Sequence, residues 1–352
     1  MERVRAAASA VLLAACVGMA GAGPARASPQ PASLPGMRPP PTYERLPLAD
    51  AGQPRPPALA ARGAQVRREV VPDATSATVP RRDCETALHL PWGPIESCRT
   101  AMVAGTLATT ATLSMLAWWS QGFTSDFSAA SEGWFGKGTY AGGIDKLGHA
   151  WSFYVATRLG TRALTWARVP PAEALGLAAG LSLGVGLGIE VLDGLSRGGR
   201  YGFSWEDMAM NLVGTGFGVL MEARPELDRY LALRLMHSRG GRDGSWYDRQ
   251  SYLLAFRLSG LAAIGPANPL RYVELVAGYG AKGFRSDLDY SSGDTRRRTA
   301  YVGLALNLTE LLDRTAFAGD ARHGRAHRWT TEALRYLQPP GTVVAARRHW
   351  RP

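Results

Sequence analysis

Lysine and cysteine are both scarce in this chain of 352 residues. Only three lysines, Lys137, Lys146 and Lys282, stand beside 37 arginines. The formal charge of +11 does not indicate a nucleic-acid partner, because the basic excess is spread over the N-terminal segment and the tail after Arg314 without interleaved aromatics. Attraction to an anionic membrane surface is the simpler use of such a charge. We therefore expect a membrane or an envelope lipid as partner, and no nucleic acid.

The three cysteines are Cys16, Cys84 and Cys98. Cys16 lies in the N-terminal signal described below. Cys84 and Cys98 precede the first long apolar segment, and in an oxidising compartment we expect a disulfide between them. A metal site is not expected at this spacing, because only His89 lies nearby.

The first 27 residues predict export. A basic start is followed by an apolar run over residues 6–22, which is typical of a signal peptide and too short for a stable membrane span. Leu13-Ala14-Ala15-Cys16 has the form of a lipobox, in which Cys16 would be lipidated, whereas residues 25–27 have the form of an ordinary signal-peptidase site. Both cleavage sites remain open. Either one predicts a membrane-associated protein in the periplasm or outer membrane of a Gram-negative bacterium.

Composition divides the rest of the chain. Residues 24–80 hold 13 of the 23 prolines and almost no aromatics, so we expect residues 28–82 to form a disordered spacer. We assign residues 83–238 to a helical bundle, 247–312 to an antiparallel β-strand region and 313–352 to a basic tail. The predicted class is α+β: a four-helix apolar bundle, either membrane-embedded or soluble, followed by a small antiparallel sheet.

Four apolar stretches predict the helices: 101–119, which has no charge, 145–167, 171–192, and one that starts after Ser204 and passes Leu220. Glycines four residues apart (Gly176, Gly180, Gly184 and Gly188, then Gly214 and Gly218) indicate faces where helix backbones approach closely. Such packing is common in membranes and favours membrane association, whereas Arg158 and Arg162 within the second helix support the alternative of a soluble bundle. Further on, residues 250–261, 271–284 and 299–308 predict three strands, and residues 332–337 a short helix.

Polar residues gather at one end of the predicted bundle. Because short connections make successive helices antiparallel, the start of the second helix, the end of the third and the start of the fourth share one end. Each of these places carries a pair at helical spacing. The candidate functional cluster comprises Asp145, Lys146, His149, Glu190, Asp193, Asp207 and Asn211.

Several roles fit this cluster. It could be a structural network of buried ion pairs, a weak divalent-metal site, a phosphate or lipid-headgroup site that also uses Arg197 and Arg200, or an acid–base site at His149. Glu190 and Asp193 are the members least explained by helix physics, because carboxylates at a helix C-terminus oppose the helix dipole. No nucleophile stands out, since Ser204 suits a helix cap. The catalytic residues and cofactors therefore remain unknown.

The cluster residues also carry a family resemblance. The segments Asp145-Lys146-Leu-Gly-His149, Gly188-Ile-Glu190-Val-Leu-Asp193, Gly202-Phe-Ser204-Trp205-Glu-Asp207 and Asn211-Leu-Val-Gly214 resemble the YfiM-type predicted periplasmic lipoproteins, a family of unknown function. The stretch from Tyr247 to Leu253 and Gly278-Tyr279-Gly280 look like its longer members, which extends the match over about residues 140–310. The order is more distantly similar to VanZ-like membrane proteins, although Asp193 and Arg197 fit that pattern only loosely. The resemblance favours lipidation at Cys16.

These patterns predict an exported cell-envelope protein whose polar cluster binds an envelope component, through a phosphate or a lipid headgroup, or has a structural role. The alternative is a membrane-associated hydrolase or transferase that acts on a lipid or cell-wall precursor. Whether the protein is an enzyme, and its oligomeric state, remain open at this stage.

Overall fold

The computed structural model describes residues 88–90, 93–95, 98–117, 119–136, 139–197, 202–238, 246–284, 296–319 and 324–351. The predicted signal peptide, the lipidation site at Cys16 and the spacer 28–82 lie outside these residues. So does Cys84, so the predicted disulfide to Cys98 remains a prediction.

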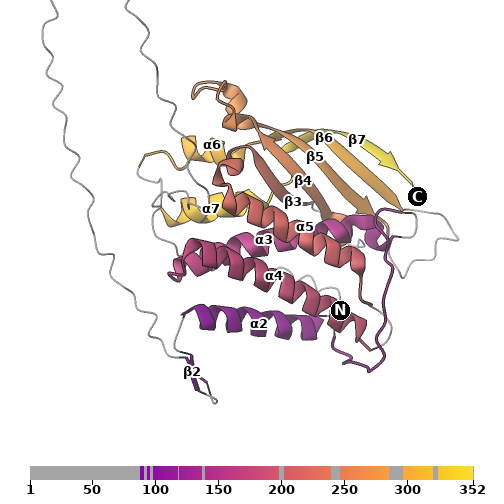
Figure 1. The fold of residues 1–352 in the computed structure, drawn as a ribbon. Helices are drawn as coiled ribbons and strands as arrows, with labels where there is room; N and C mark the ends of the chain where they lie inside the picture. The colour runs from indigo at the N-terminus through magenta and orange to yellow at the C-terminus, as the bar shows by residue number, and fades with distance from the viewer. Residues whose placement is uncertain are drawn as a thin grey trace, which may run out of the picture. The chain divides into compact units, whose positions relative to one another are not determined.

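The helices follow the predicted order (Figure 1). After a short hairpin of β1 (Leu88–Leu90) and β2 (Gly93–Ile95), the chain forms α2 (Cys98–Ala117), α3 (Ile144–Trp166), α4 (Pro171–Gly194) and α5 (Trp205–Ala223). Pro171 opens α4, where its fixed φ and missing N–H are tolerated. The Ser204 hydroxyl accepts a hydrogen bond from the Asp207 N–H at 3.2 Å, which confirms the predicted cap of α5.

The helix α3 packs against both α4 and α5, which also contact each other. A Cβ on Gly214 would stand 2.1 Å from the Ala150 carbonyl oxygen, and one on Gly218 would stand 2.9 Å from Thr157 Cβ, so both glycines permit close approach as predicted. Gly176, Gly180, Gly184 and Gly188 differ: a Cβ at any of them would meet nothing within 4 Å. The interpretation that they mediate helix packing is wrong for the described residues, because α4 turns a different stripe, which includes Ala178 and Gly186, towards α3.

The helix α2 is mostly exposed. Among its described side chains only Ser114 is buried, and its apolar part covers Val103–Leu116. The α+β class is confirmed, but the described residues do not clearly form the compact four-helix apolar bundle that we predicted. Of the described helices, α4 alone is long and apolar enough to cross a membrane by length and composition.

The sheet is antiparallel, with five strands in the order β3-β4-β5-β6-β7. The strands are β3 (Leu231–His237), β4 (Gln250–Arg257), β5 (Val273–Lys282), β6 (Arg297–Leu306) and β7 (Val343–Trp350). The three central strands match the prediction. The sheet is wider than expected, because β3 comes from the range assigned to the bundle and β7 from the basic tail. Their arginines, Arg234 in β3 and Arg347 and Arg348 in β7, weaken the apolar alternation that identifies a strand.

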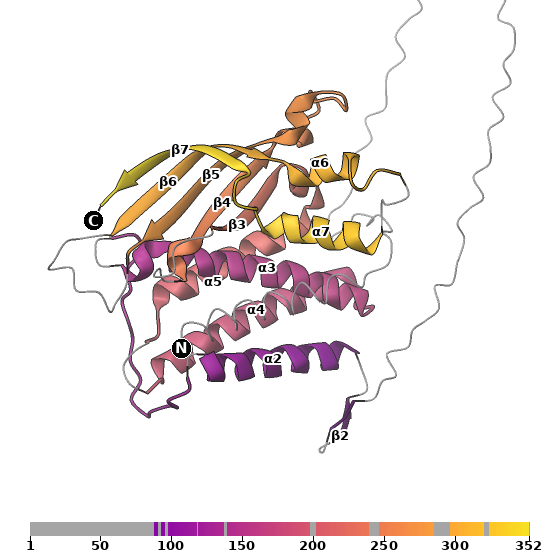
Figure 2. The same cartoon turned by 180° about the vertical axis from the view of Figure 1, so that it is seen from behind.

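Helices cover one side of this sheet. In Figures 1 and 2, α3 and α7 (Arg325–Tyr336) lie beside the sheet, with α4 and then α2 farther away. Trp151 and Tyr154 of α3 share a core with Tyr252 of β4 and Tyr336 of α7. The helix α7 confirms the short helix predicted near residues 332–337. The remaining elements are α6 (Leu308–Arg314) and the 3-10 turns η1 (Tyr140–Gly143), η2 (Pro225–Arg229), η3 (Tyr247–Arg249), η4 (Leu258–Gly260) and η5 (Pro269–Tyr272).

The two arginines within α3 belong to a network of ion pairs. Arg158 Nε lies 2.7 Å from Glu222 Oε1, and its Nη2 lies 2.6 Å from Asp228 Oδ2. Arg162 and Arg335 complete this network, which we call the arginine network. It comprises three cations, Arg158, Arg162 and Arg335, and three carboxylates, Glu222, Asp228 and Glu332. The network joins α3, α5, η2 and α7.

Candidate functional site

The predicted cluster residues meet at one end of the helices. Asp145, Lys146 and His149 lie at the start of α3, Glu190 and Asp193 at the end of α4, and Asp207 and Asn211 at the start of α5. Five of them are buried, and two of these five, Lys146 and Asn211, are fully buried; the other three are Asp145, Glu190 and Asp207. The spacing argument therefore placed these seven residues correctly, although it does not by itself give them a function.

Lys146 lies at the centre of the cluster. Its Nζ stands 2.7 Å from Asp207 Oδ1 and 3.4 Å from Asp145 Oδ2, and it also donates a hydrogen bond to Glu132 Oε2. Burial would lower the pKa of this ammonium, but Asp145 and Asp207 outweigh burial and raise it. Lys146 is therefore a permanent positive charge that three carboxylates share.

His149 lies at the edge of the cluster, where 24 % of its side chain is exposed. Its Nδ1 stands 2.8 Å from Asn211 Oδ1, so the Nδ1–H can donate to that carbonyl. Its Nε2 faces Asp207 Oδ1 at 3.8 Å and Asp145 Oδ2 at 4.0 Å. Burial would lower the pKa of His149, but these two carboxylates raise it to about 9, so the ring is an imidazolium near neutral pH.

The two carboxylates at the end of α4 are held by donors from other segments. Glu190 Oε2 accepts a hydrogen bond from the Ser204 N–H at 3.1 Å, and Asp193 Oδ1 accepts one from the Trp119 indole at 2.6 Å. Burial raises the pKa of Glu190 to about 8, and the charge of Asp207 adds to this effect. Burial likewise raises the pKa of Asp193 to about 6, although the indole hydrogen bond opposes it. These donors explain how the helix end tolerates both carboxylates.

Three members of the site were missed in the sequence. Two of them, Trp119 and Glu132, lie in the irregular segment between α2 and α3, where no helical spacing indicates them. Glu132 pairs with Lys146. Tyr247 donates a hydrogen bond to Asp145 Oδ1 at 2.6 Å from the turn before β4. Burial and the charges of Asp145 and Asp207 raise the pKa of Glu132 to about 7. The site therefore holds five carboxylates against two cations.

One subset of the cluster has the geometry of a metal site. Asp145, His149 and Asp207 each offer a ligand atom, and these atoms lie within 4.8 Å of one another. Carboxylate oxygens and imidazole nitrogens suit several divalent metals. However, the Lys146 ammonium already stands beside the carboxylates of Asp207 and Asp145. A metal ion would have to displace this ammonium, so the geometry does not favour a metal over it.

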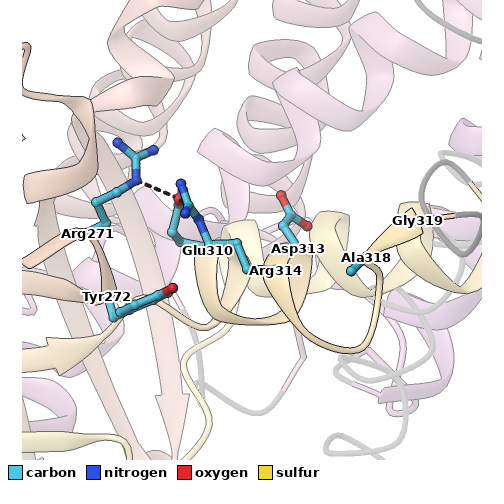
Figure 3. Close-up of a pocket in the computed structure, with 7 residues that line it drawn as sticks. All are labelled: Arg271, Tyr272, Glu310, Asp313, Arg314, Ala318 and Gly319. Carbon is cyan, nitrogen blue, oxygen red and sulfur yellow. Dashed lines mark hydrogen bonds and ion pairs between the residues drawn. The ribbon is translucent and has the colours of Figure 1, made fainter. Parts of the chain in front are cut away.

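A surface cavity of about 660 Å³ lies elsewhere (Figure 3). It is lined by Arg271, Tyr272, Glu310, Asp313, Arg314, Ala318 and Gly319, none of which belongs to the cluster. Its charged groups are already paired: Arg271 Nε and Arg314 Nε each lie 2.8 Å from Glu310 Oε1, and His327 Nε2 lies 2.8 Å from Asp313 Oδ1. The cavity therefore offers no chemistry comparable to that of the cluster.

Comparison with known families supports the resemblance seen in the sequence. Residues 131–223 match the family model described as "Predicted periplasmic lipoprotein (DUF2279)". This part of the chain is similar to the DUF2279 family. The DUF2279 segment contains Glu132 and all seven predicted cluster residues, but it ends with α5, short of the predicted match to residue 310. The family description agrees with the predicted exported, periplasmic and membrane-associated location.

Comparison with curated proteins and with solved structures gives no further relative of the chain. No curated protein and no solved structure matches the chain. The more distant resemblance to VanZ-like membrane proteins is not shown by the family match.

Proposed function

We propose that the polar cluster binds a positively charged group of an envelope component, such as the ammonium of a lipid headgroup. The observation that carries this proposal is the excess of acid: five carboxylates surround two cations in a largely buried site. Three of those carboxylates, Glu132, Glu190 and Asp193, have a raised pKa, so they hold protons more tightly than they would in water. A cationic ligand would take the place of these protons.

The arginine network provides an internal comparison. There, three carboxylates face three arginines, and Arg335 and Arg158 outweigh burial and lower the pKa of Asp228 to about 2. The pKa of Glu332 is lowered for the same reason. Balanced charges of this kind suit a purely structural role. In the polar cluster the pKa values of three carboxyl groups are raised instead of lowered. Several raised carboxyl pKa values in one place are more typical of a functional site.

The same acid excess disfavours the phosphate that we expected as a ligand. A phosphate group carries about −1.5 to −2 charge near neutral pH. Lys146 is fully buried and already paired with three carboxylates, so it offers no free donor to an anion. Of the two headgroup chemistries, a cationic amine therefore fits the cluster better than a phosphate does. Access would come at the exposed edges of His149 and Glu132.

A hydrolase or transferase remains the alternative, but no specific observation favours it. Ser204 is 1 % exposed and caps α5, so it is a poor nucleophile. A pKa of about 9 makes His149 a proton donor rather than a base near neutral pH.

The pH dependence of binding tests the proposal. We would titrate the full chain with monomeric short-chain phosphatidylethanolamine, which has an ammonium, and with phosphatidylglycerol, which lacks one, at about pH 6 and pH 8. Because Glu190 and Glu132 lose protons over this range, the affinity for phosphatidylethanolamine should rise with pH. Asp207→Asn should weaken that binding, whereas Asp228→Asn in the arginine network should not. Equal binding of both lipids, an affinity that falls with pH, or no binding at all would each overturn the proposal.

A further inference from the structure

The outer face of α4 is apolar and uncovered. From Ala174 to Ile189 the helix has no charged residue. Its buried stripe, Ala174, Ala178, Ser182, Gly186, Glu190 and Gly194, lies on one face. The opposite face carries the four glycines that have nothing within 4 Å of a Cβ, and Leu187, which lies beside that face, is 48 % exposed. This helix is therefore apolar on a side where its glycines have open space, although α2 lies nearby.

The neighbouring helices present apolar side chains as well. On α2, which has no charge from Thr100 to Ala117, the exposed large side chains are Leu107, Met115 and Leu116. On α5 they are Leu212, Val213 and Leu220. We call the exposed side chains of α2, α4 and α5 the apolar face. Seven exposed large apolar side chains on three neighbouring helices are more than the isolated apolar side chains that are normal on a soluble protein.

We propose that the apolar face is immersed in one leaflet of a lipid bilayer, with α2 and α4 lying in the plane of the membrane. Hydrocarbon fits this face chemically, because α2 has no charged residue from Thr100 to Ala117 and α4 has none from Ala174 to Ile189. The description of the matching family, a predicted periplasmic lipoprotein, supplies a separate reason for a membrane, because a lipid anchor would hold such a chain at a membrane surface. An N-terminal lipid would only tether the chain, whereas this contact holds the folded domain itself against the membrane.

The arginine network decides between lying in the membrane and crossing it. Arg158 lies in the middle of α3, and it is 1 % exposed and paired with Glu222 and Asp228. An upright orientation would put this network and the sheet beside it at the depth of the hydrocarbon, where charges are expensive. With the axes of α2 and α4 parallel to the membrane plane, the sheet and the helices α3 and α7 remain on the aqueous side, because they lie on the far side of α4 from α2 (Figures 1 and 2). The arginines of the network belong to α3 and α7, so the network stays on that side as well.

A second copy of the chain is the competing occupant, because glycines at four-residue spacing also suit helix pairing. Such a contact would cover the glycines of α4 and their immediate neighbours. The apolar face includes more than α4, because α2 and α5, which both contact α4, have exposed apolar side chains such as Leu116 and Leu212. A bilayer covers the whole of this surface, so we assign the face to lipid.

Site-directed spin labels test this assignment in the full chain, reconstituted in vesicles of phosphatidylethanolamine and phosphatidylglycerol. Labels would be attached at Leu187→Cys, Gly176→Cys and Gly184→Cys, with Leu270→Cys on η5 as the control. Leu187 and Leu270 are matched, with 48 % and 46 % exposure, and both glycine sites have open space for a side chain. The parent chain, labelled at its native cysteines alone, provides the background.

We expect the three α4 labels to be severalfold more accessible to oxygen, relative to a water-soluble nickel chelate, than the label at Leu270. Their depths should agree with one another, because the helix lies in the plane of the membrane. Equal accessibility at Leu187 and Leu270 would overturn the proposal. A steady gradient of label depth from residue 176 to residue 187 would overturn the proposal in favour of a membrane span. Strong spin–spin coupling between labels on two chains would overturn it in favour of a dimer.

Discussion

Replacing Glu190 with glutamine should stabilise the protein at alkaline pH, although it removes a buried charged group with a hydrogen bond. Glu190 is 2 % exposed, and its pKa is raised to about 8 from an ordinary value of 4.5. The folded chain therefore keeps a proton that the unfolded chain releases, so the stability that Glu190 contributes falls as the pH rises from about 4.5 to about 8. Glutamine is neutral at every pH and removes this loss.

The size of the effect follows from the shift. One pKa unit corresponds to about 1.4 kcal/mol, so the full shift of Glu190 sets an upper limit of about 5 kcal/mol at pH above 8. Neighbouring carboxylates exchange protons with Glu190, which reduces the gain for one substitution to about 2–3 kcal/mol. The amide oxygen of glutamine can still accept the Ser204 N–H, so no buried donor is left without an acceptor.

Urea unfolding of the parent chain and of Glu190→Gln, at about pH 5, 7 and 8.5 in mild detergent, measures this gain. The two chains should be nearly equally stable at about pH 5, and the variant should be more stable as the pH rises. Asp228→Asn is the matched control, because the arginines lower the pKa of Asp228 to about 2. That variant should lose about 2–4 kcal/mol at neutral pH. The reasoning is refuted if Glu190→Gln is less stable than the parent at pH 8.5, or if its effect does not change with pH.

Three further predictions concern other parts of the molecule. Lys146→Met should destabilise the fold by about 3–5 kcal/mol in the same unfolding assay, because three carboxylates lose their shared cation. Lys282 is exposed, so the control Lys282→Met should change the free energy of unfolding little. Gly214→Ala should destabilise the protein, because its Cβ would stand 2.1 Å from the Ala150 carbonyl oxygen. A Cβ at Gly180 would meet nothing within 4 Å, so Gly180→Ala should stabilise α4 by up to about 1 kcal/mol. Equal effects of the two substitutions on stability would contradict the packing described above. Growth with a fatty-acid analogue should label the parent chain but not Cys16→Ser, and label on both would exclude the lipobox.

The sequence was sufficient to predict the helix starts and the cluster because both depend on local spacing. Ser204 stands three residues before Asp207, and Asp145 stands four before His149, so each pair lies on one helix face whatever the tertiary packing. The antiparallel connections then brought the helix ends together. Glu132 and Tyr247 escaped prediction because they reach the site from irregular segments, where spacing carries no such information.

The glycines on α4 illustrate what the sequence could not decide. Four-residue spacing places Gly176 and Gly180 on one face, but it does not say whether a neighbour covers that face. The covered face of α4 instead contains Ala178 and Ser182, and only the position of α3 distinguishes the two faces. The edge strands were missed for a similar reason, since Arg234 in β3 is buried through an ion pair with Glu274 that lies far away in the sequence.

Infrared spectroscopy of the carboxyl groups tests the acid excess most directly, because protonated and ionised carboxyls absorb at different frequencies. At about pH 7 the parent chain should show a band from protonated carboxylic acid, which Glu190 and Glu132 account for, and it should fade as the pH rises to about 9. Glu190→Gln should reduce that band, and Glu222→Gln should leave it unchanged. A spectrum without protonated carboxyls at pH 7 would mean that the pKa values of Glu190 and Glu132 are not raised, so the cluster would hold no protons for a cationic ligand to replace.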